Sequence, residues 1–252
     1  MLERAIKEFN KYAANYDLEI PSVDLKYNHT FRVVEYAKKI LESLDVSEHM
    51  LSIGCIAALL HDIARFEQFT KYGTYKDSIS FDHGLRGAQI LLENDYINNY
   101  VQNDDDKRVI VNAILKHNKR DLELTGDDFV DTIAKVVRDA DKLDIMVIVG
   151  NDIKDPNYQI NKKMFEDIIN SRSCDYKNVI CSDDQVLGII GFVFDVNYQK
   201  SFEIIRESNV IDLKINLLRK YCDAVKIDLL EQSVNEFIEK KIGDEKYVRN
   251  KV

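Results

Sequence analysis

Four of the five histidines in this chain have apolar residues three, four or seven positions away, which is the spacing of one helix face. They are His29, His61, His83 and His117. An acid, Asp62, directly follows the second of them, and a further acid, Asp141, lies downstream. Inward-pointing imidazoles and carboxylates are costly to bury unless something pairs with them. Because a metal ion is the usual partner for such nitrogen and oxygen donors, this order of residues predicts a metal site.

The elements that must position these residues are predicted to be helices. The chain has 252 residues, 45% of them hydrophobic, with 9 Gly and 2 Pro, so we expect a sizeable core, long helices and short connections. Ser22 or Asp24, Ser47, and Ser80 or Asp82 are candidate helix caps. The periodicity predicts helices over about 3–15, 22–44, 47–63, 82–91, 107–117, 128–149, 160–172 and 183–242.

Two stretches break this pattern. Residues 65–80 are aromatic, polar and aperiodic, and we expect a structured loop whose rings either line a pocket or pack against the core. The composition shifts after residues 150–156. We therefore expect an all-α protein in which residues 1–150 form the core that holds the histidines, and residues 151–252 form a helical C-terminal extension packed on that core.

Charge and cysteine usage limit the classes of function. The formal net charge of −9 argues against general nucleic-acid binding but admits a small phosphorylated substrate, because bound divalent metals would reverse the local field. The four scattered cysteines form no C-x-x-C pair and fit a reduced cytosol. The first residues do not resemble a signal peptide, and the longest apolar run is too short for a bilayer. We expect a cytoplasmic protein that binds neither nucleic acid nor membrane, with a homo-oligomer left open.

One shared carboxylate could organise two sets of ligands. Adjacent helix residues point about 100° apart, so His61 and Asp62 reach one site only across the end of a helix or between its faces. Helix bundles build metal sites from one or two inward ligands on each helix. The candidate sets are His29, His61, Asp62 and Asp141 and, if Asp62 bridges two ions, Asp62, His83 and His117.

In this order the six residues resemble the HD-domain superfamily of metal-dependent phosphohydrolases. The first set matches the defining pattern of the family. The second pair of histidines matches that of two-metal members, among them bacterial symmetrical dinucleoside-tetraphosphate hydrolases and some cyclic-dinucleotide phosphodiesterases. The resemblance covers roughly residues 20–150, and residues 65–69 and 183–206 are similar to an uncharacterised bacterial branch. It implies an HD-domain helical bundle followed by the C-terminal extension.

The chain departs from the family at two places. His117 is followed by Asn118 and Lys119, whereas the cyclic-di-GMP enzymes continue with a glycine-tyrosine-proline signature, so that activity is disfavoured. Ala64 stands where the family usually has a glycine after the His-Asp pair.

Basic residues near the expected site are candidates for holding substrate phosphate. Arg65 matches a basic residue that the family places three positions after the His-Asp pair, and it lies one helical turn beyond His61. Its planar guanidinium could clamp a phosphate through two hydrogen bonds, and a structural ion pair is the alternative role. The further candidates for substrate binding are Arg86, Lys119 and Lys142.

The resemblance implies metal-assisted hydrolysis of a phosphomonoester, phosphodiester or phosphoanhydride in a small substrate, for which we expect a nucleotide. One or two divalent ions (Fe, Mn, Co, Ni or Zn) would bind, and a hydroxide bridging two ions roughly 3.5–4 Å apart would attack phosphorus. Asp62 and Arg65 are the residues expected to act in catalysis. Two rival functions use the same ligands: a di-iron oxygenase of the HD type, and a non-catalytic module that binds metal or nucleotide.

Other polar residues have structural interpretations. Asp139 and Asp144 compete with Asp141 as ligands, and their alternative roles are surface charge or the orientation of a ligand histidine. His49 is expected on a solvated face. The acidic run at 104–106 lacks the spacing of a calcium loop and is predicted to be a solvated turn.

Overall fold

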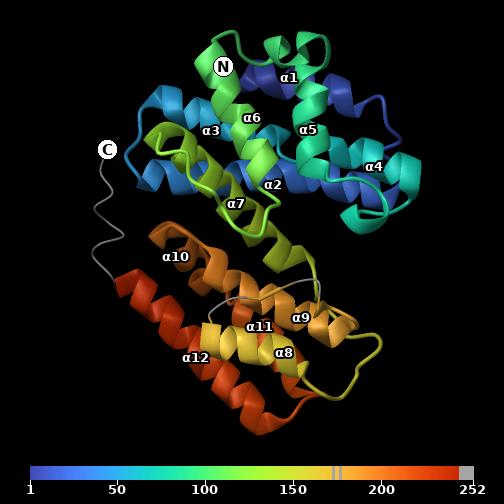
Figure 1. The fold of residues 1–252 in the computed structure, drawn as a ribbon, viewed down its shortest axis with the longest axis vertical. Coiled ribbons are helices and arrows are strands. Elements are labelled where there is room, and N and C mark those ends of the chain that lie inside the picture. Colours follow the sequence, from blue (N-terminus) through green and yellow to red (C-terminus); the bar gives the residue numbers. More distant parts are fainter. Residues whose placement is uncertain (172–173, 176–177, 244–252) are drawn as a thin grey trace. The chain divides into compact units, whose positions relative to one another are not determined.

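The computed structural model describes residues 1–171, 174–175 and 178–243, and these residues form helices and no strand (Figure 1). The predicted all-α class is therefore confirmed. The chain divides into two compact units, one of residues Met1–Asp141 and one that begins at Lys142. The division expected at residue 150, and the packing of the C-terminal extension on the core, stay predictions.

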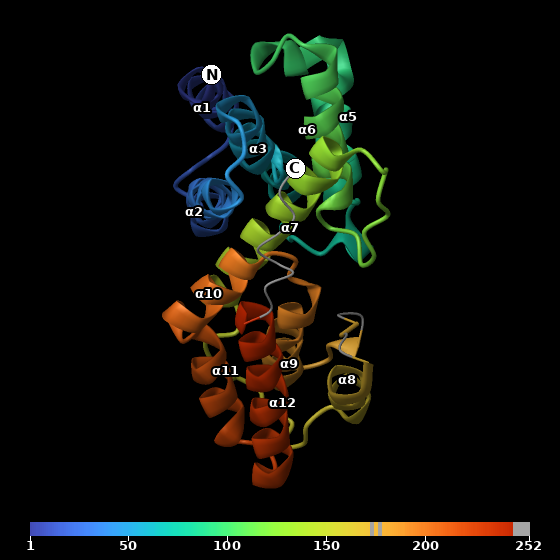
Figure 2. The same ribbon diagram turned by 90° about the vertical axis from the view of Figure 1, so that its left-hand side faces the viewer.

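The first unit is built around the buried helix α3. Its helices are α1 (Leu2–Ala13), α2 (Pro21–Ser43), α3 (Glu48–Leu60), α4 (Ala64–Tyr72), α5 (His83–Leu92), α6 (Asp104–Lys116) and the first part of α7 (Asp128–Ile148), with the 3-10 helices η1 (Asp77–Ile79) and η2 (Glu93–Asn99). α3 contacts α1, α2 and α6 (Figure 2). A window within Glu48–Tyr72 is apolar enough for a membrane span by composition, and 72% of it is buried inside the fold, as in a core helix.

Side-chain caps fix the start of two helices that carry candidate ligands. At the start of α3, Ser47 Oγ accepts a hydrogen bond from the backbone N–H of Met50 at 3.2 Å. At the start of α5, Asp82 Oδ1 accepts from the backbone N–H of Leu85 at 3.0 Å. Each cap satisfies an N–H group that has no partner within its own helix. The predictions of caps at Ser47 and Asp82 are therefore confirmed.

Two other predicted helix starts are wrong. α2 begins at Pro21, whose fixed φ suits the first turn, so neither Ser22 nor Asp24 caps it. α6 begins earlier than expected, at Asp104, and Asn103 caps it. The acidic run thus forms the first turn of a helix, where the helix dipole favours negative charge, and not a turn that precedes it.

The loop expected over residues 65–80 is wrong for its first half, because residues 64–72 form α4. α4 buries Ala64, Phe66 and Gln68, and this mixed set carries no continuous apolar stripe that would reveal a helix. The helix ends at Gly73, whose φ of 64° is a left-handed conformation that suits glycine. The residues that follow contain η1 and lead into α5.

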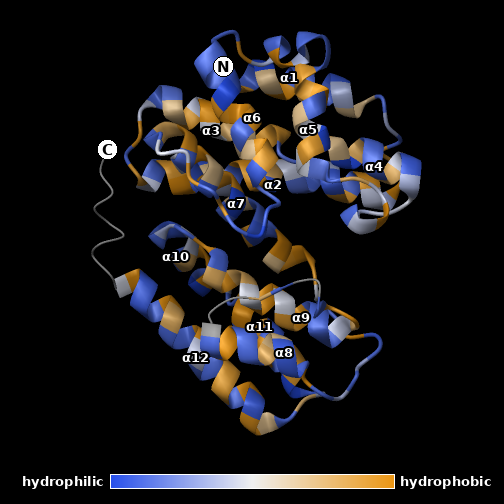
Figure 3. Ribbon diagram, in the orientation of Figure 1, coloured by the Kyte–Doolittle hydropathy of each residue, from blue (hydrophilic) through white to orange (hydrophobic). Residues whose placement is uncertain are grey.

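The second unit contains the last residues of α7 and the helices that follow it. They are α8 (Lys162–Glu166), the π-helix η3 (Asp167–Ser171), α9 (Ser182–Gly191), the 3-10 helix η5 (Phe192–Asp195), α10 (Gln199–Ser208), α11 (Val210–Arg219) and α12 (Ala224–Gly243). Hydrophobic and hydrophilic residues alternate along these helices (Figure 3). The buried Lys214 donates to the backbone oxygens of Val149 at 2.6 Å and Gly150 at 2.9 Å, which satisfies carbonyls just beyond the end of α7.

Candidate metal centre

The six candidate ligands lie together in the first unit, several of them at helix ends. In chain order they are His29 on α2, His61 at the end of α3, Asp62 in the turn after it, His83 at the start of α5, His117 at the end of α6 and Asp141 on α7. The side chains of the first five are buried, and that of Asp141 is 15% exposed.

The ligand atoms form two groups that share Asp62. Its Oδ2 lies 3.5 Å from Nε2 of both His29 and His61. Its Oδ1 faces the other way, 3.5 Å from Nε2 of His83 and 3.6 Å from Nε2 of His117. One carboxylate therefore presents one oxygen to each group, as a bridge between two adjacent sites would.

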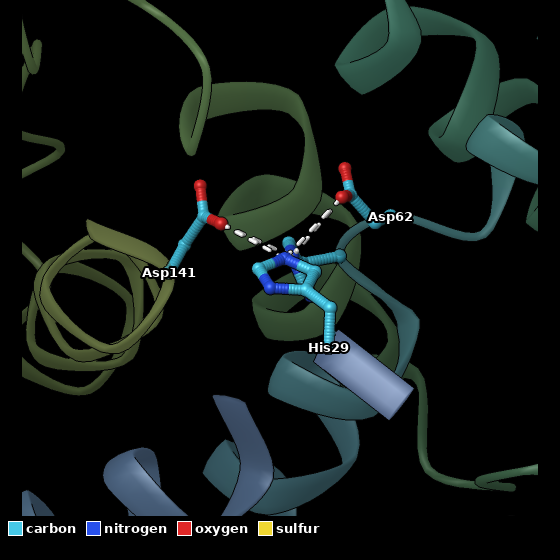
Figure 4. A group of neighbouring side chains, drawn as sticks. His29, Asp62 and Asp141 are labelled. Carbon is cyan, nitrogen blue, oxygen red and sulfur yellow. Dashed lines mark hydrogen bonds and ion pairs between the residues drawn. The ribbon is translucent and has the colours of Figure 1, made fainter. Parts of the chain in front are cut away.

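Asp141 completes the first group from the opposite side (Figure 4). The ring of His29 lies between the two carboxylates, with Nε2 3.2 Å from Asp141 Oδ1 and 3.5 Å from Asp62 Oδ2. Asp139 and Asp144 are also buried, but neither belongs to a group of ligand atoms among the described residues.

The imidazole rings of His61, His83 and His117 are oriented by hydrogen bonds at Nδ1. In His61 and His117 this nitrogen donates to a backbone carbonyl of its own helix, that of Ala58 or Ile114, each at 2.7 Å. A carbonyl only accepts, so the proton of a neutral ring sits on Nδ1 and the lone pair on Nε2 points into the site. In His83, Nδ1 faces a carboxylate at 2.6 Å, and burial lowers its pKa to about 4, with the charge of Arg65 adding to the effect, so this ring is neutral at pH 7.

This arrangement fits divalent cations. The Nε2 atoms of His29 and His61 are 3.3 Å apart, and those of His83 and His117 are 3.0 Å apart. Lone pairs that converge on one another and on carboxylates repel unless a cation lies among them. Among the described residues, Asp141 Oδ1 is a buried oxygen without a hydrogen-bond partner, which a metal ion would also satisfy.

Close packing of α5 against α6 brings the second pair of histidines together. A Cβ on Gly84 would meet Asn118 Oδ1 at 2.6 Å and the backbone oxygen of Ile114 at 2.9 Å. A Cβ on Gly87 would meet Ile114 Cγ2 at 3.1 Å. Glycine is therefore required at Gly84 for an approach this close, because any side chain would push the start of α5 away from the end of α6.

Lys26 belongs to the site although the sequence reasoning did not identify it. It lies one helical turn before His29 on α2, and its Nζ donates to Asp62 Oδ2 at 2.6 Å. Burial raises the pKa of Asp62, but nearby positive charges, above all Lys26, outweigh burial and hold this pKa well below its ordinary value. The spacing from His29 was the signal that could have revealed Lys26, since residues three apart share a helix face.

Arg65 reaches the site and is held in a network of protein groups. Its Nε donates to Asp62 Oδ1 at 3.3 Å, and its Nη1 donates to Gln68 Oε1 at 2.6 Å, to the backbone oxygen of Tyr75 at 2.7 Å and to Asp77 Oδ1 at 3.0 Å. The expected projection of Arg65 toward the His-Asp pair is thus observed. Its roles in phosphate binding and catalysis stay predictions.

The other basic candidates pair with acids outside the two ligand groups. Arg86 contacts Glu67 at 2.9 Å and Glu93 at 2.5 Å, and Lys119 pairs with Asp82. In the second unit, Lys142 pairs with Asp195 at 3.0 Å. Their roles in substrate binding also stay predictions.

Comparison with known proteins gives one family. Residues 27–146 match the model of the HD domain, and this range includes all six candidate ligands. No curated protein and no solved structure matches the chain. Residues 27–146 belong to the HD-domain superfamily, whose domains bind divalent metals and are generally metal-dependent hydrolases.

Proposed function

We propose that this HD-domain protein is a metal-dependent phosphohydrolase that cleaves a phosphoester or phosphoanhydride bond of a small molecule, with a nucleotide as the expected substrate. The observation that carries the proposal is the position of Asp62 between two groups of inward-facing imidazoles, with one oxygen toward each group. The family supports the reaction class. We propose one divalent ion for each group.

The chain's own residues prepare this site in three ways. The Nε2 lone pairs and the carboxylates of Asp62 and Asp141 provide donors for the ions. Lys26 and Arg65 each hold one oxygen of Asp62, which fixes the carboxylate between the two groups. Divalent ions bound there would activate water and neutralise charge on phosphate oxygens. We propose that Lys26 and Arg65 also neutralise substrate charge, because they are the cations that contact the shared carboxylate.

The test is a screen of the purified protein for metal-dependent hydrolysis, measured as release of phosphate, of an alcohol or of a nucleotide. Protein prepared without oxygen would be loaded with Mn²⁺ or Fe²⁺ and given phosphomonoesters, phosphodiesters and dinucleoside polyphosphates. We expect turnover of at least one class, dependent on metal and abolished in Asp62→Asn. Nucleotide binding without turnover under every metal, or oxygen consumption by the iron-loaded protein without hydrolysis, would contradict the proposal.

A further inference from the structure

His83 is oriented by a side chain that belongs to neither ligand group. His61 and His117 donate from Nδ1 to carbonyls of their own helices. In His83, Nδ1 instead lies 2.6 Å from Oδ2 of Asp77, which is in the 3-10 helix η1. A carboxylate accepts, so the ring donates from Nδ1 and keeps the lone pair on Nε2.

We infer that Asp77 is a positioning residue that fixes the proton of His83 on Nδ1 and thereby creates the ion site of the second group. The inference rests on the metal site proposed above and not on the reaction that the site performs. It assigns a function to a surface turn in which the sequence indicated no site residue. Carboxylates that receive the second N–H of a ligating histidine fix its orientation and raise its basicity.

Asp77 is itself held firmly, although its side chain is 33% exposed. Its Oδ1 accepts from Arg65 Nη1 at 3.0 Å and from Gln68 Nε2 at 2.9 Å. The buried Gln68 also donates to Ser80 Oγ at 2.7 Å, which anchors the turn to α4. Because Arg65 contacts Asp62 Oδ1 as well, one guanidinium joins the two carboxylates that flank His83.

A competing donor makes this contact decisive. The side-chain amide nitrogen of Asn118 lies 3.4 Å from His83 Nδ1. If that amide donated to Nδ1, the ring proton would sit on Nε2, and Nε2 could not bind a cation. Asp82 draws the amide away by accepting from it at 2.8 Å, and Asp77 occupies Nδ1 directly.

The second group would keep too few ligands for an ion if His83 carried its proton on Nε2. It consists of Asp62, His83 and His117, so Asp62 and His117 alone would remain. The first group has four members, and Asp77 contacts none of its histidines among the described contacts. Loss of Asp77 should therefore weaken the binding of the ion in the second group and leave the binding of the ion in the first group unchanged.

The experiment compares Asp77→Asn with Asp82→Asn in the full-length protein. Both changes remove one negative charge near the start of α5. Asparagine at position 82 keeps an acceptor oxygen for the cap and for the amide of Asn118, and of the two acids only Asp77 contacts the imidazole. Equilibrium dialysis against Mn²⁺ would count ions and measure both affinities. The ¹⁵N chemical shifts of the metal-free protein would report which nitrogen of His83 carries the proton.

We expect Asp77→Asn to lower the affinity of the second group for its ion about 10–100-fold and to leave the affinity of the first group unchanged. The proton of His83 should shift toward Nε2. Asp82→Asn should keep both ions, and Asp77→Glu, which restores the carboxylate, should recover part of the loss. An Asp77→Asn protein with wild-type affinity and the proton still on Nδ1 would overturn the inference, as would an equal loss in Asp82→Asn. Wild type that binds two ions but has no hydrolase activity would overturn the proposed function alone.

Discussion

The two ligand groups share a carboxylate but differ in what supports them. The histidines of the first group have no exposed surface, and they lie on α2 and at the end of α3, two helices that pack directly on each other. In the second group, His83 depends on a carboxylate in a surface turn and on the network of Arg65 and Gln68. The comparison teaches that two packed helices carry the histidines of the first group, whereas His83 of the second group also relies on polar contacts from the turn before α5.

The largest effect is expected from the residue that both groups share. Asp62→Asn removes the bridging charge and leaves Lys26 with a weaker partner in a buried site. We expect the binding of both ions to be lost or greatly weakened. Because activity depends on the bound ions, kcat/KM should fall at least about 10³-fold. Metal analysis and steady-state kinetics would measure this. Loss of only one ion would contradict a bridging role.

Acid should lower the stability of the metal-free protein through protonation of His83 in the second group. Its pKa is lowered by burial from 6.5 to about 4, so between these values the unfolded chain binds a proton that the native chain does not. The stability of the metal-free protein should therefore fall as pH falls from 6.5 to about 4, by about 3 kcal/mol in all. Asp62 does not contribute in this window, because a lowered carboxyl pKa costs stability only below its ordinary value of 3.8.

Urea unfolding of the metal-free protein at several pH values would measure this slope. His83→Gln is the matched control, because it removes the titrating ring and keeps a polar side chain. An unchanged slope in that variant would show that other groups cause the acid sensitivity.

Close packing of α5 on α6 offers a way to perturb the second ligand group. In Gly84→Ala the new methyl group would meet the backbone oxygen of Ile114 at 2.9 Å, so the start of α5 must shift. We expect a loss of about 1–3 kcal/mol in unfolding free energy and a weaker second ion. Gly243→Ala, where a Cβ meets nothing within 4 Å, should be neutral or slightly stabilising. Equal effects of the two substitutions would argue against the packing explanation.

The smallest effect is expected from a change at Lys26, which should raise the affinity for an ion where the other substitutions lower it. Lys26 donates to Asp62 Oδ2 and places a positive charge beside the first group. Lys26→Met should therefore raise the affinity of the first group for its ion several-fold, because a cation no longer meets this repulsion. It should also lower kcat/KM, if Lys26 neutralises the substrate as proposed. Calorimetric titration with Mn²⁺ would decide, and weaker binding would contradict this description of the site.

The sequence indicated the helices and the candidate ligands because apolar residues recur at helical spacing and the ligand histidines share these apolar faces. His29 and His117 lie on apolar stripes, and the order of the six residues matched a family, so the residues that the structure brings together could be named in advance. Lys26 was missed although its spacing from His29 could have revealed it, and Asp77 could not be named because it lies in a stretch without periodicity. α4 was missed because its buried residues include the hydrogen-bonded Gln68 and form no continuous apolar stripe.

The most direct test of the account is the number of ions bound by protein purified without oxygen, in wild type and in His83→Ala. The account predicts close to two ions per chain in wild type and close to one in the variant, because the first group keeps all of its members. One ion in both proteins would remove His83 from the site and leave a single-ion centre. No bound ion in wild type, even after reconstitution, would contradict the central claim.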